Sequence, residues 1–408
     1  MCGIWAVFGC PSKALLSKCL PDVLKIRHRG PDAFSMLSVG ELENCLLGFV
    51  RLSIVDPLHG MQPLKLKKHE HLFLVFNGEI YNYLHLKEQF GFEFETNCDT
   101  EVILHLYAIG GIEFCVQHLH GVFAFILADV INNKVFFARD TFGVRPLFSL
   151  EQLQGSEWPG FTVVGSEVKS LMTAHRSCPE GTATVKIHLP GHFSEYDLCP
   201  KSGSVHLVRS ERFHEVWAKP VYAVRETTPE MTSLERVRHT LTNAVDVRMM
   251  ADCKLGCLLS GGLDSSLICA LVKQKMPEWG CNYPLETFAI GLDAKSSDLV
   301  AAQMVADHIG STHHNIIHTA EEFLSCIDDL IYQIETYDVT TIRSSVVMHF
   351  LCKYIREHSQ CKILFSGEGS DEVSQGYIYF HNAPDAQSAY DESVRLLNDL
   401  YLFDVLRA

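Results

Sequence analysis

The second residue of the chain is a cysteine, Cys2, and removal of the initiator Met1 would make it N-terminal. Such a residue carries both a nucleophilic thiol and a basic α-amine. The amine titrates near ~8 and the thiol near ~8.5, so the amine can accept the thiol proton at neutral pH. The alternative is a buried structural cysteine at the start of a strand, because apolar residues follow closely.

Other residues in the same half could support attack on a carboxamide. The attack builds an oxyanion that fixed donors must meet. Asn77 and Gly78 could supply a side-chain amide and an unhindered backbone N–H. Arg51 could bind a substrate carboxylate, and Asp99 could pair with a substrate ammonium. Taken singly, Arg51 could form a surface ion pair, Asp99 could cap a helix and Asn77-Gly78 could form a hairpin turn.

The stretch LSGGLDSS, residues 259–266, follows an apolar run and precedes a helical pattern. Its glycines let backbone N–H groups close on an anion, its serines add donors, and a helix N-terminus carries partial positive charge. The stretch therefore predicts a phosphate site, although no G-x-x-x-x-G-K-[ST] motif for a γ-phosphate occurs. The alternative is a plain Gly-Gly turn with Asp264 as the helix N-cap.

A second glycine-rich stretch, SGEGSDE at 366–372, has the same setting between a strand and a helix. Loops at the carboxyl ends of parallel strands face one crevice, so we expect the two loops to meet. Asp264 in the first loop, with Glu368 and Asp371 in the second, offers the carboxylates that Mg²⁺ takes together with phosphate oxygens. The two loops together predict a nucleotide site with Mg²⁺.

The first half of the chain has the pattern of antiparallel strands, with short β-rich runs separated by Gly, Asn and Pro. One helix is expected after residues 99–101, ending at the glycine pair 110–111. The predicted strands are 4–8, 46–55, 72–76, 122–130 and 134–139.

The second half alternates short apolar strands with helices, which indicates βαβ units around a parallel sheet. Residues 193–230 show scattered Pro, Gly and Ser, so we expect a connecting segment between domains over 2–192 and 231–408. The stretch 394–408 is helical in pattern and lacks a stop signal, so the second domain is expected to be incomplete.

Composition and charge exclude several classes of function. The formal charge is −15, from 34 basic and 49 acidic residues, and it is spread along the chain. Nucleic-acid binding needs clustered Lys and Arg, so we expect no nucleic-acid partner. We expect no membrane partner, because the apolar runs are short. The 15 cysteines show no disulfide spacing, which favours a reducing cytosol, and the 21 histidines form no HExxH motif.

The first half resembles the class-II, N-terminal-nucleophile glutamine amidotransferase domain over nearly all of residues 2–190. The matching motifs are CGIW at 2–5, HRGPD at 28–32, GMQP at 60–63, FNGEIYN at 76–82 and RDTFGVRPL at 139–147. The resemblance implies an α+β sandwich with Cys2 as nucleophile and Asn77 and Gly78 as oxyanion hole. The glutamine-binding residues that it implies are Arg51, Leu52, Ser53, Ile54, Val55, Asn77, Gly78, Glu79 and Asp99.

The second half resembles the ATP pyrophosphatases in SGGLDSS at 260–266. Together with TFAIG at 287–291, ETYDVTTIR at 335–343 and SGEGSDE, the chain is similar to glutamine-dependent asparagine synthetases. That family makes asparagine from aspartate, ATP and the ammonia of glutamine through β-aspartyl-AMP, with AMP and pyrophosphate as products. The implied fold is an ATP-pyrophosphatase-type α/β parallel-sheet domain, here incomplete.

The same resemblance implies roles for individual residues of the second half. Arg343 would stabilise charge on the phosphates, Glu368 would act in the acyl-adenylate and ammonia steps, and Asp264 and Asp371 would ligate Mg²⁺. The implied ATP-binding residues are Leu258, Ser260, Gly261, Gly262, Asp264, Ser265, Ser266, Ile290, Ser366 and Gly367.

Two alternatives stay open at this point. Members of the family continue beyond the length of this chain, so the chain could retain glutaminase activity alone and act as a regulatory or binding partner. A related β-lactam-forming synthetase is disfavoured, because the glutaminase set Cys2, Arg51, Asn77 and Asp99 is complete. The expected partners are glutamine, aspartate and ATP, with a homodimer left open.

Overall fold

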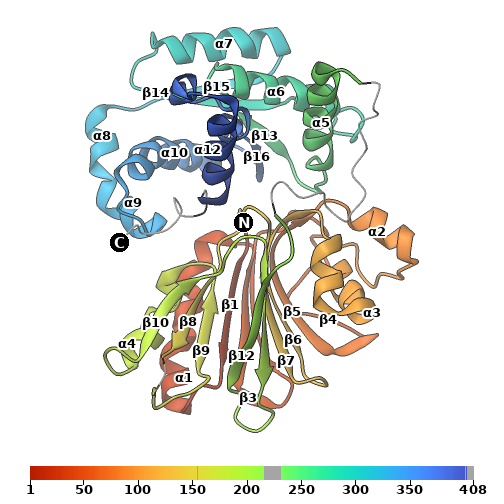
Figure 1. The fold of residues 1–408 in the computed structure, drawn as a ribbon. Helices are drawn as coiled ribbons and strands as arrows, with labels where there is room; N and C mark the ends of the chain where they lie inside the picture. Colours follow the sequence, from red (N-terminus) through yellow and green to blue (C-terminus); the bar gives the residue numbers. More distant parts are fainter. Residues whose placement is uncertain (154, 216–230, 400, 402–408) are drawn as a thin grey trace. The chain divides into compact units, whose positions relative to one another are not determined.

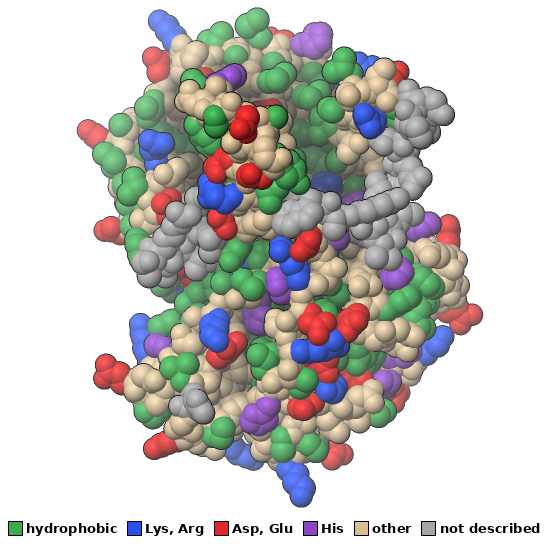
Figure 2. Space-filling view, viewed as in Figure 1, with side chains coloured by type: hydrophobic (Ala, Val, Ile, Leu, Met, Phe, Trp, Pro, Cys, Tyr) green, Lys and Arg blue, Asp and Glu red, His purple; other side chains and the backbone are tan. Residues whose placement is uncertain are grey.

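The computed structural model describes residues 1–153, 155–215, 231–399 and 401. The chain forms two compact units, Met1–Val224 and Arg225–Ala408, which are described separately (Figure 1). Among the residues described, no helix is both long and apolar enough to cross a bilayer. On the face shown in Figure 2, acidic and basic side chains are interspersed rather than gathered by sign.

Two six-stranded antiparallel sheets form the centre of the first unit. The first sheet contains, in spatial order, β10 (Ala183–Ile187), β8 (Phe148–Gln152), β9 (Thr162–Gly165), β1 (Gly3–Phe8), β3 (Leu42–Arg51) and β2 (Ala33–Val39). The second contains β12 (Val205–Arg212), β11 (His192–Leu198), β7 (Lys134–Arg139), β6 (Gly121–Asp129), β5 (His69–Ile80) and β4 (Leu64–Leu66).

The two sheets face each other, and β5 shows how its sequence allows this. Phe73 and Val75 pack in one buried cluster with Ile4 and Phe8 of β1, from the other sheet. Their neighbours along β5, such as Leu74, pack in a second cluster with α3. Successive side chains of a strand point to opposite faces, so a strand covered on both sides reads as a continuous apolar run.

Helices cover the outer faces of both sheets, which gives four layers (Figure 1). The α+β sandwich expected from the sequence is thereby confirmed. On the first sheet lie α1 (Lys13–Cys19), the 3₁₀ helices η1 (Leu20–Arg29) and η2 (Val168–Ser170), and α4 (Met172–Ser177). On the second lie α2 (Tyr83–Phe90) and α3 (Glu101–His118).

Several local predictions for this unit need correction. The predicted helix does not end at its glycine pair: the backbone kinks at Gly111, with φ 74°, and α3 continues to His118. The run 46–55 stops being a strand at Arg51, and the next four residues form a loop. Residues 193–212, assigned to a connecting segment, form most of β11 and β12, because β11 buries Phe193 in the cluster beside α3 and Tyr196 in the cluster between the two sheets.

The second unit is built on a four-stranded parallel sheet, as the alternating pattern predicted. Its spatial order is β15 (Thr312–Ile317), β14 (Glu286–Gly291), β13 (Leu255–Leu258) and β16 (Ile363–Phe365). The helices are α5 (Ser233–Val247), α6 (Leu263–Lys275), α7 (Ser297–Ile309), α8 (Ala320–Ser325), α9 (Ile327–Ile334), α10 (Val339–His358), α11 (Ser370–Ser374), η3 (Ile378–Asn382) and α12 (Ala386–Asp399).

Helices of this unit cover both faces of the sheet. Cys257 of β13 packs in one core cluster with Cys269 of α6 and Ala302 of α7. Phe288 of β14 packs in another with Leu351 of α10. The predicted helix over 394–408 is observed as far as Asp399, where α12 ends, and most of the remainder lies outside the described residues.

Candidate active site

A pocket opens in the first unit where the neighbouring strands β1 and β3 face β5 of the other sheet. Its empty volume is about 470 Å³, including its open side. The pocket gathers most of the residues implied for glutamine hydrolysis, namely Cys2, Arg51, Leu52, Ile54, Val55, Asn77, Gly78, Glu79 and Asp99. Ser53 does not line it, and its backbone N–H donates to Asp32 Oδ2 at 2.8 Å.

The Cys2 thiol is fixed at one wall of this pocket. Its Sγ accepts a hydrogen bond from the Leu52 N–H at 3.3 Å and lies 3.5 Å from the Leu52 carbonyl oxygen. Burial raises the pKa of the thiol, and the Leu52 N–H and the charges of Arg51 and Arg145 oppose this only in part. A thiol in this setting stays protonated at neutral pH, so it needs a base to become a nucleophile.

A neutral amine is available at the same place. Burial lowers the pKa of the Met1 amine to about 5, and the positive charges of Arg145 and Arg29 lower it as well. Removal of Met1 would place the free amine on Cys2 itself. An amine that is unprotonated at pH 7 can accept the thiol proton.

Asn77 offers the pocket an amide without a partner. The residue is 1% exposed, and neither its side-chain nitrogen nor its oxygen has a hydrogen-bond partner in the described structure. A buried unsatisfied polar group costs about 1–3 kcal/mol, so the amide is arranged for a ligand rather than for stability. Gly78 beside it is required by close packing, because a Cβ there would lie 2.0 Å from the Val122 carbonyl oxygen.

Asn77 and Gly78 do not form the hairpin turn that was one alternative. They lie within β5, where Asn77 pairs with Ala124 of β6. Asn77 follows Phe73 and Val75 on the face of β5 that points toward the other sheet. Because side chains alternate between the two faces of a strand, the Asn77 amide points toward the start of β1.

Two opposite charges are buried on the pocket wall. Arg51 is 6% exposed, and its guanidinium donates to the carbonyl oxygens of Pro57 at 3.0 Å and of Asp56. It forms no ion pair with any described carboxylate, which excludes the surface ion pair. Asp99 is 4% exposed and accepts from the Ile80 N–H at 2.7 Å. Together these groups complement the carboxylate and the ammonium of an amino acid.

Asp99 does not cap α3, because Thr100 occupies the N-cap position. Burial raises the pKa of Asp99 to about 6, and the nearby Glu79 charge adds to this effect. The carboxyl group is therefore ionised at pH 7 and neutral below about pH 6. A substrate ammonium can pair only with the ionised form.

We expect this titration to control glutamine binding. In the native chain, KM for glutamine should rise as pH falls below about 6, approaching tenfold per pH unit, because protonated Asp99 loses its charge. The D99N variant should have a KM raised on the order of 30-fold at pH 7, with little dependence on pH. Initial rates of glutamate release between pH 5 and 7.5 measure both. An equal rise of KM below pH 6 in D99N would assign the titration to another group.

Sequence reasoning assigned no role to Arg145, which also lines the pocket. Its Nε is buried without a hydrogen-bond partner in the described structure. Asp140 holds the preceding turn by accepting from the Val144 N–H at 3.0 Å and the Arg145 N–H at 3.2 Å. The motif RDTFGVRPL contains both residues, so it was the signal that could have identified this second cation.

In the second unit, the loop after β13 is tightly packed and contains three serine hydroxyls. Gly261 has φ +83°, and a Cβ there would lie 2.5 Å from the Ala302 backbone nitrogen, so only glycine fits against α7. The hydroxyls of Ser260 and Ser265 lie 2.9 Å apart. The Ser266 hydroxyl is buried and has no partner in the described structure.

The loop after β16 touches this first loop, as the sequence predicted. A Cβ at Gly367 would lie 2.8 Å from the Ser265 backbone nitrogen and 3.1 Å from the Asp264 Cβ. Leu258 and Ile290 lie at the ends of the adjacent strands β13 and β14, partly buried against Phe288.

The structure brings the remaining residues implied for the second unit together less closely. Glu368 and Asp371 are exposed, and so is Arg343 of α10. Arg343 forms no hydrogen bond or ion pair with described residues. Among the residues that the structure describes, no group of three or more His, Cys, Asp or Glu side chains is placed to hold a metal ion.

Comparison with known proteins shows the family of each unit. The asparagine synthase family matches residues 236–407, and the glutamine amidotransferase domain family matches residues 1–195. All 408 residues align with asparagine synthetase [glutamine-hydrolyzing] from Gallus gallus, at 50% identity over 415 aligned positions and 72% of that protein's length. The corresponding proteins of Mus musculus and Homo sapiens are each 48% identical over 417 positions, again with 72% of their length covered. This chain therefore belongs to the glutamine-hydrolysing asparagine synthetases, the family that makes asparagine with glutamine as nitrogen donor.

Proposed function

We propose that the first unit hydrolyses glutamine with Cys2 as its N-terminal nucleophile, after Met1 has been removed. The observation that carries the proposal is the unpartnered Asn77 amide, buried in one pocket with the Cys2 thiol. Arg51 and Asp99 would hold the glutamine carboxylate and ammonium, and the chain from Leu52 to Val55 with Glu79 would complete the binding site. The domain with this activity would span residues 2–192 together with β11 and β12.

The first step transfers a proton and forms a covalent bond. The thiol proton passes to the Cys2 amine while Sγ attacks the side-chain carbonyl carbon of glutamine. Asn77 and the Gly78 N–H would stabilise the oxyanion. The C–N bond then breaks, and the protonated amine gives its proton to the departing nitrogen, which leaves as ammonia. Water attacks the remaining thioester, releases glutamate and returns the thiol.

We further propose that the second unit activates aspartate, with residues 231–408 as its domain. The family uses ATP. Its pyrophosphate end would bind at Ser260 to Ser266 and at Ser366-Gly367, with Leu258 and Ile290 beside the nucleoside. The aspartate β-carboxylate would attack the α-phosphorus, expelling pyrophosphate, and ammonia would displace AMP to give asparagine. Glu368 would serve these two steps, and Arg343 would approach the phosphates.

Asp264 and Asp371 would hold Mg²⁺. Two carboxylates suit this ion, because Mg²⁺ is usually bound by one or two carboxylates plus substrate phosphates. When bound, the ion neutralises phosphate charge. Buried free thiols such as Cys257 and Cys269 support a reducing cytosol as the place of reaction.

The unpartnered Ser266 hydroxyl leads to a prediction in which stability is kept while ATP binding is weakened. In S266A, removal of an unsatisfied buried hydroxyl should leave the unfolding temperature unchanged or raised, whereas KM for ATP should rise about tenfold because one phosphate donor is lost. S265A is the matched control, because it removes the hydroxyl bonded to Ser260 and should lower the unfolding temperature. A loss of stability in S266A as large as that in S265A would contradict the assignment.

One assay tests the whole proposal on this chain. With glutamine, aspartate and Mg-ATP, we expect glutamate, pyrophosphate and asparagine to rise in step. Formation of glutamate alone would mean that only the first unit is active. That result would favour a regulatory or binding role for the chain, for example as a homodimer. Absence of glutamate would overturn the glutaminase assignment.

A further inference from the structure

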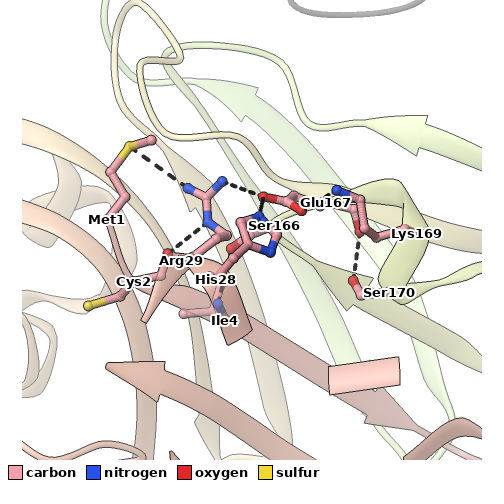
Figure 3. Close-up of polar contacts among 9 residues, drawn as sticks. All are labelled: Met1, Cys2, Ile4, His28, Arg29, Ser166, Glu167, Lys169 and Ser170. Atoms are coloured by element: carbon pink, nitrogen blue, oxygen red, sulfur yellow. Dashed lines mark hydrogen bonds and ion pairs between the residues drawn. The ribbon is translucent and has the colours of Figure 1, made fainter. Parts of the chain in front are cut away.

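A buried carboxylate, Glu167, stands at the centre of a charged cluster close to Cys2 (Figure 3). Arg29 Nη1 donates to its Oε1 at 2.8 Å, His28 Nε2 lies 3.0 Å from the same oxygen, and Lys169 Nζ lies 2.8 Å from Oε2. The side chains of Glu167, Arg29 and Lys169 are at most 10% exposed. Burial would raise the pKa of Glu167, but the hydrogen bonds and charges of these neighbours lower it to about 2.

Arg29 connects the cluster to Cys2. Arg29 Nε donates to the Cys2 carbonyl oxygen at 3.0 Å, while Arg29 Nη1 donates to Glu167 (Figure 3). Planar guanidinium geometry makes these two bonds directional, so the carboxylate determines where Nε points. Arg29 is the last residue of η1, and Glu167 follows β9. Arg29 therefore links the Cys2 carbonyl to a carboxylate from a distant segment of the chain.

Cys2 needs this support because it lies just outside the sheet. β1 begins at Gly3, which pairs with Val50 of β3, and the pairing with β9 starts only at Trp5. On the β9 side, Ile4 is anchored by its N–H to Ser166 Oγ at 3.0 Å, and its carbonyl accepts from the Ser166 N–H at 3.0 Å. The Arg29–Glu167 pair extends this anchoring by two residues toward the N-terminus.

We propose that Glu167 is a positioning residue for glutamine hydrolysis, because it keeps Arg29 on the Cys2 carbonyl and thereby orients the main chain that carries both the thiol and the amine. The inference rests on the proposed role of Cys2. An N-terminal residue is held covalently from one side only, so a bond to its carbonyl restrains the rotation that swings its amine and side chain. Misplacement by about 1 Å can cost on the order of 10²-fold in rate.

The test is glutaminase kinetics of E167Q. Gln keeps the size of the side chain but removes the charge and half of its acceptor capacity, so kcat should fall about 10- to 100-fold. KM for glutamine should stay within about twofold, because Arg51 and Asp99 lie on other segments and do not touch the cluster. R29K should show the same pattern, because a lysine ammonium cannot hold Cys2 and Glu167 in one fixed fork.

A matched control separates positioning from general stabilisation. Glu195 of β11 also has a largely buried carboxylate paired with two cations, Lys134 at 2.6 Å and Arg209 at 2.8 Å, and it lies in the other sheet. E195Q should lose stability to a similar degree as E167Q and keep the native kcat. The rate at which iodoacetamide alkylates Cys2, followed from pH 5 to 9, should change in E167Q and not in E195Q.

Four outcomes test this inference and separate it from the function on which it depends. Native kcat in E167Q and R29K would overturn the role of Glu167, and so would a loss of kcat equal to that in E195Q. If E167Q does not fold, R29K alone decides, because it keeps the Glu167 carboxylate and a positive charge beside it. C2A measured in parallel tests the proposed function itself: an active C2A would overturn both, whereas an inactive C2A with an unaffected E167Q would overturn only the positioning role.

Discussion

The C2A variant is expected to lose glutamine hydrolysis by on the order of 10⁴-fold or more, because it lacks the sulfur that we propose forms the thioester. Alanine also leaves the rest of the pocket in place, so glutamine should still bind between Arg51 and Asp99. Glutamate release under saturating glutamine measures the loss. Asparagine formation from added ammonia measures the second unit separately and should be unchanged.

The control is C199A, which removes a half-exposed thiol from the turn between β11 and β12, away from the pocket. It should keep the native rate of glutamate release. Glutamate release by C2A at the rate of C199A would remove Cys2 from the mechanism and leave it as a thiol packed at the start of β1.

The second large effect is expected from N77A. Loss of one oxyanion donor typically lowers kcat about 10²- to 10³-fold, with little change in KM, because the donor acts on charge that develops in the transition state. The same substitution breaks no hydrogen bond in the described structure, since both polar atoms of Asn77 are without partners. The unfolding temperature should therefore change little. Steady-state kinetics and thermal unfolding of one preparation test both parts.

Asn82 provides a control with the opposite behaviour. Its side chain donates to the His118 carbonyl at 2.9 Å and accepts from the His120 N–H at 3.0 Å, and it does not line the pocket. N82A should lower the unfolding temperature and keep kcat. If N77A behaves like N82A, the Asn77 amide supports the fold rather than the oxyanion.

Much of the architecture followed from local patterns in the sequence. The run at 4–8 and the alternation of short strands and helices after residue 233 appear in the structure as β1 and the parallel sheet, because burial on both faces of a strand leaves an unbroken apolar run. The contact of the loops at Asp264 and Gly367 also followed, since parallel neighbouring strands end at one edge of a sheet.

Other features depend on contacts that no local pattern reports. The strands β11 and β12 contain exposed polar residues, and β11 follows a Pro-Gly turn, so their sequence resembles a linker although Phe193 and Tyr196 are buried in the folded sandwich. Leu52, Ile54 and Val55 continue the run of β3, yet they leave the sheet and line the pocket. Neighbours in space can be far apart in sequence: Arg29 and Glu167 are separated by 138 positions.

The central claim is that Cys2 attacks glutamine as the N-terminal residue. The most direct measurement is mass spectrometry of this chain after reaction with a glutamine analogue that carries an electrophilic carbon in place of the side-chain amide. We expect one adduct per chain, located on Cys2 in an N-terminal peptide that lacks Met1, and protection by excess glutamine. An adduct on another residue, or full glutaminase activity in a chain that retains Met1, would contradict the account.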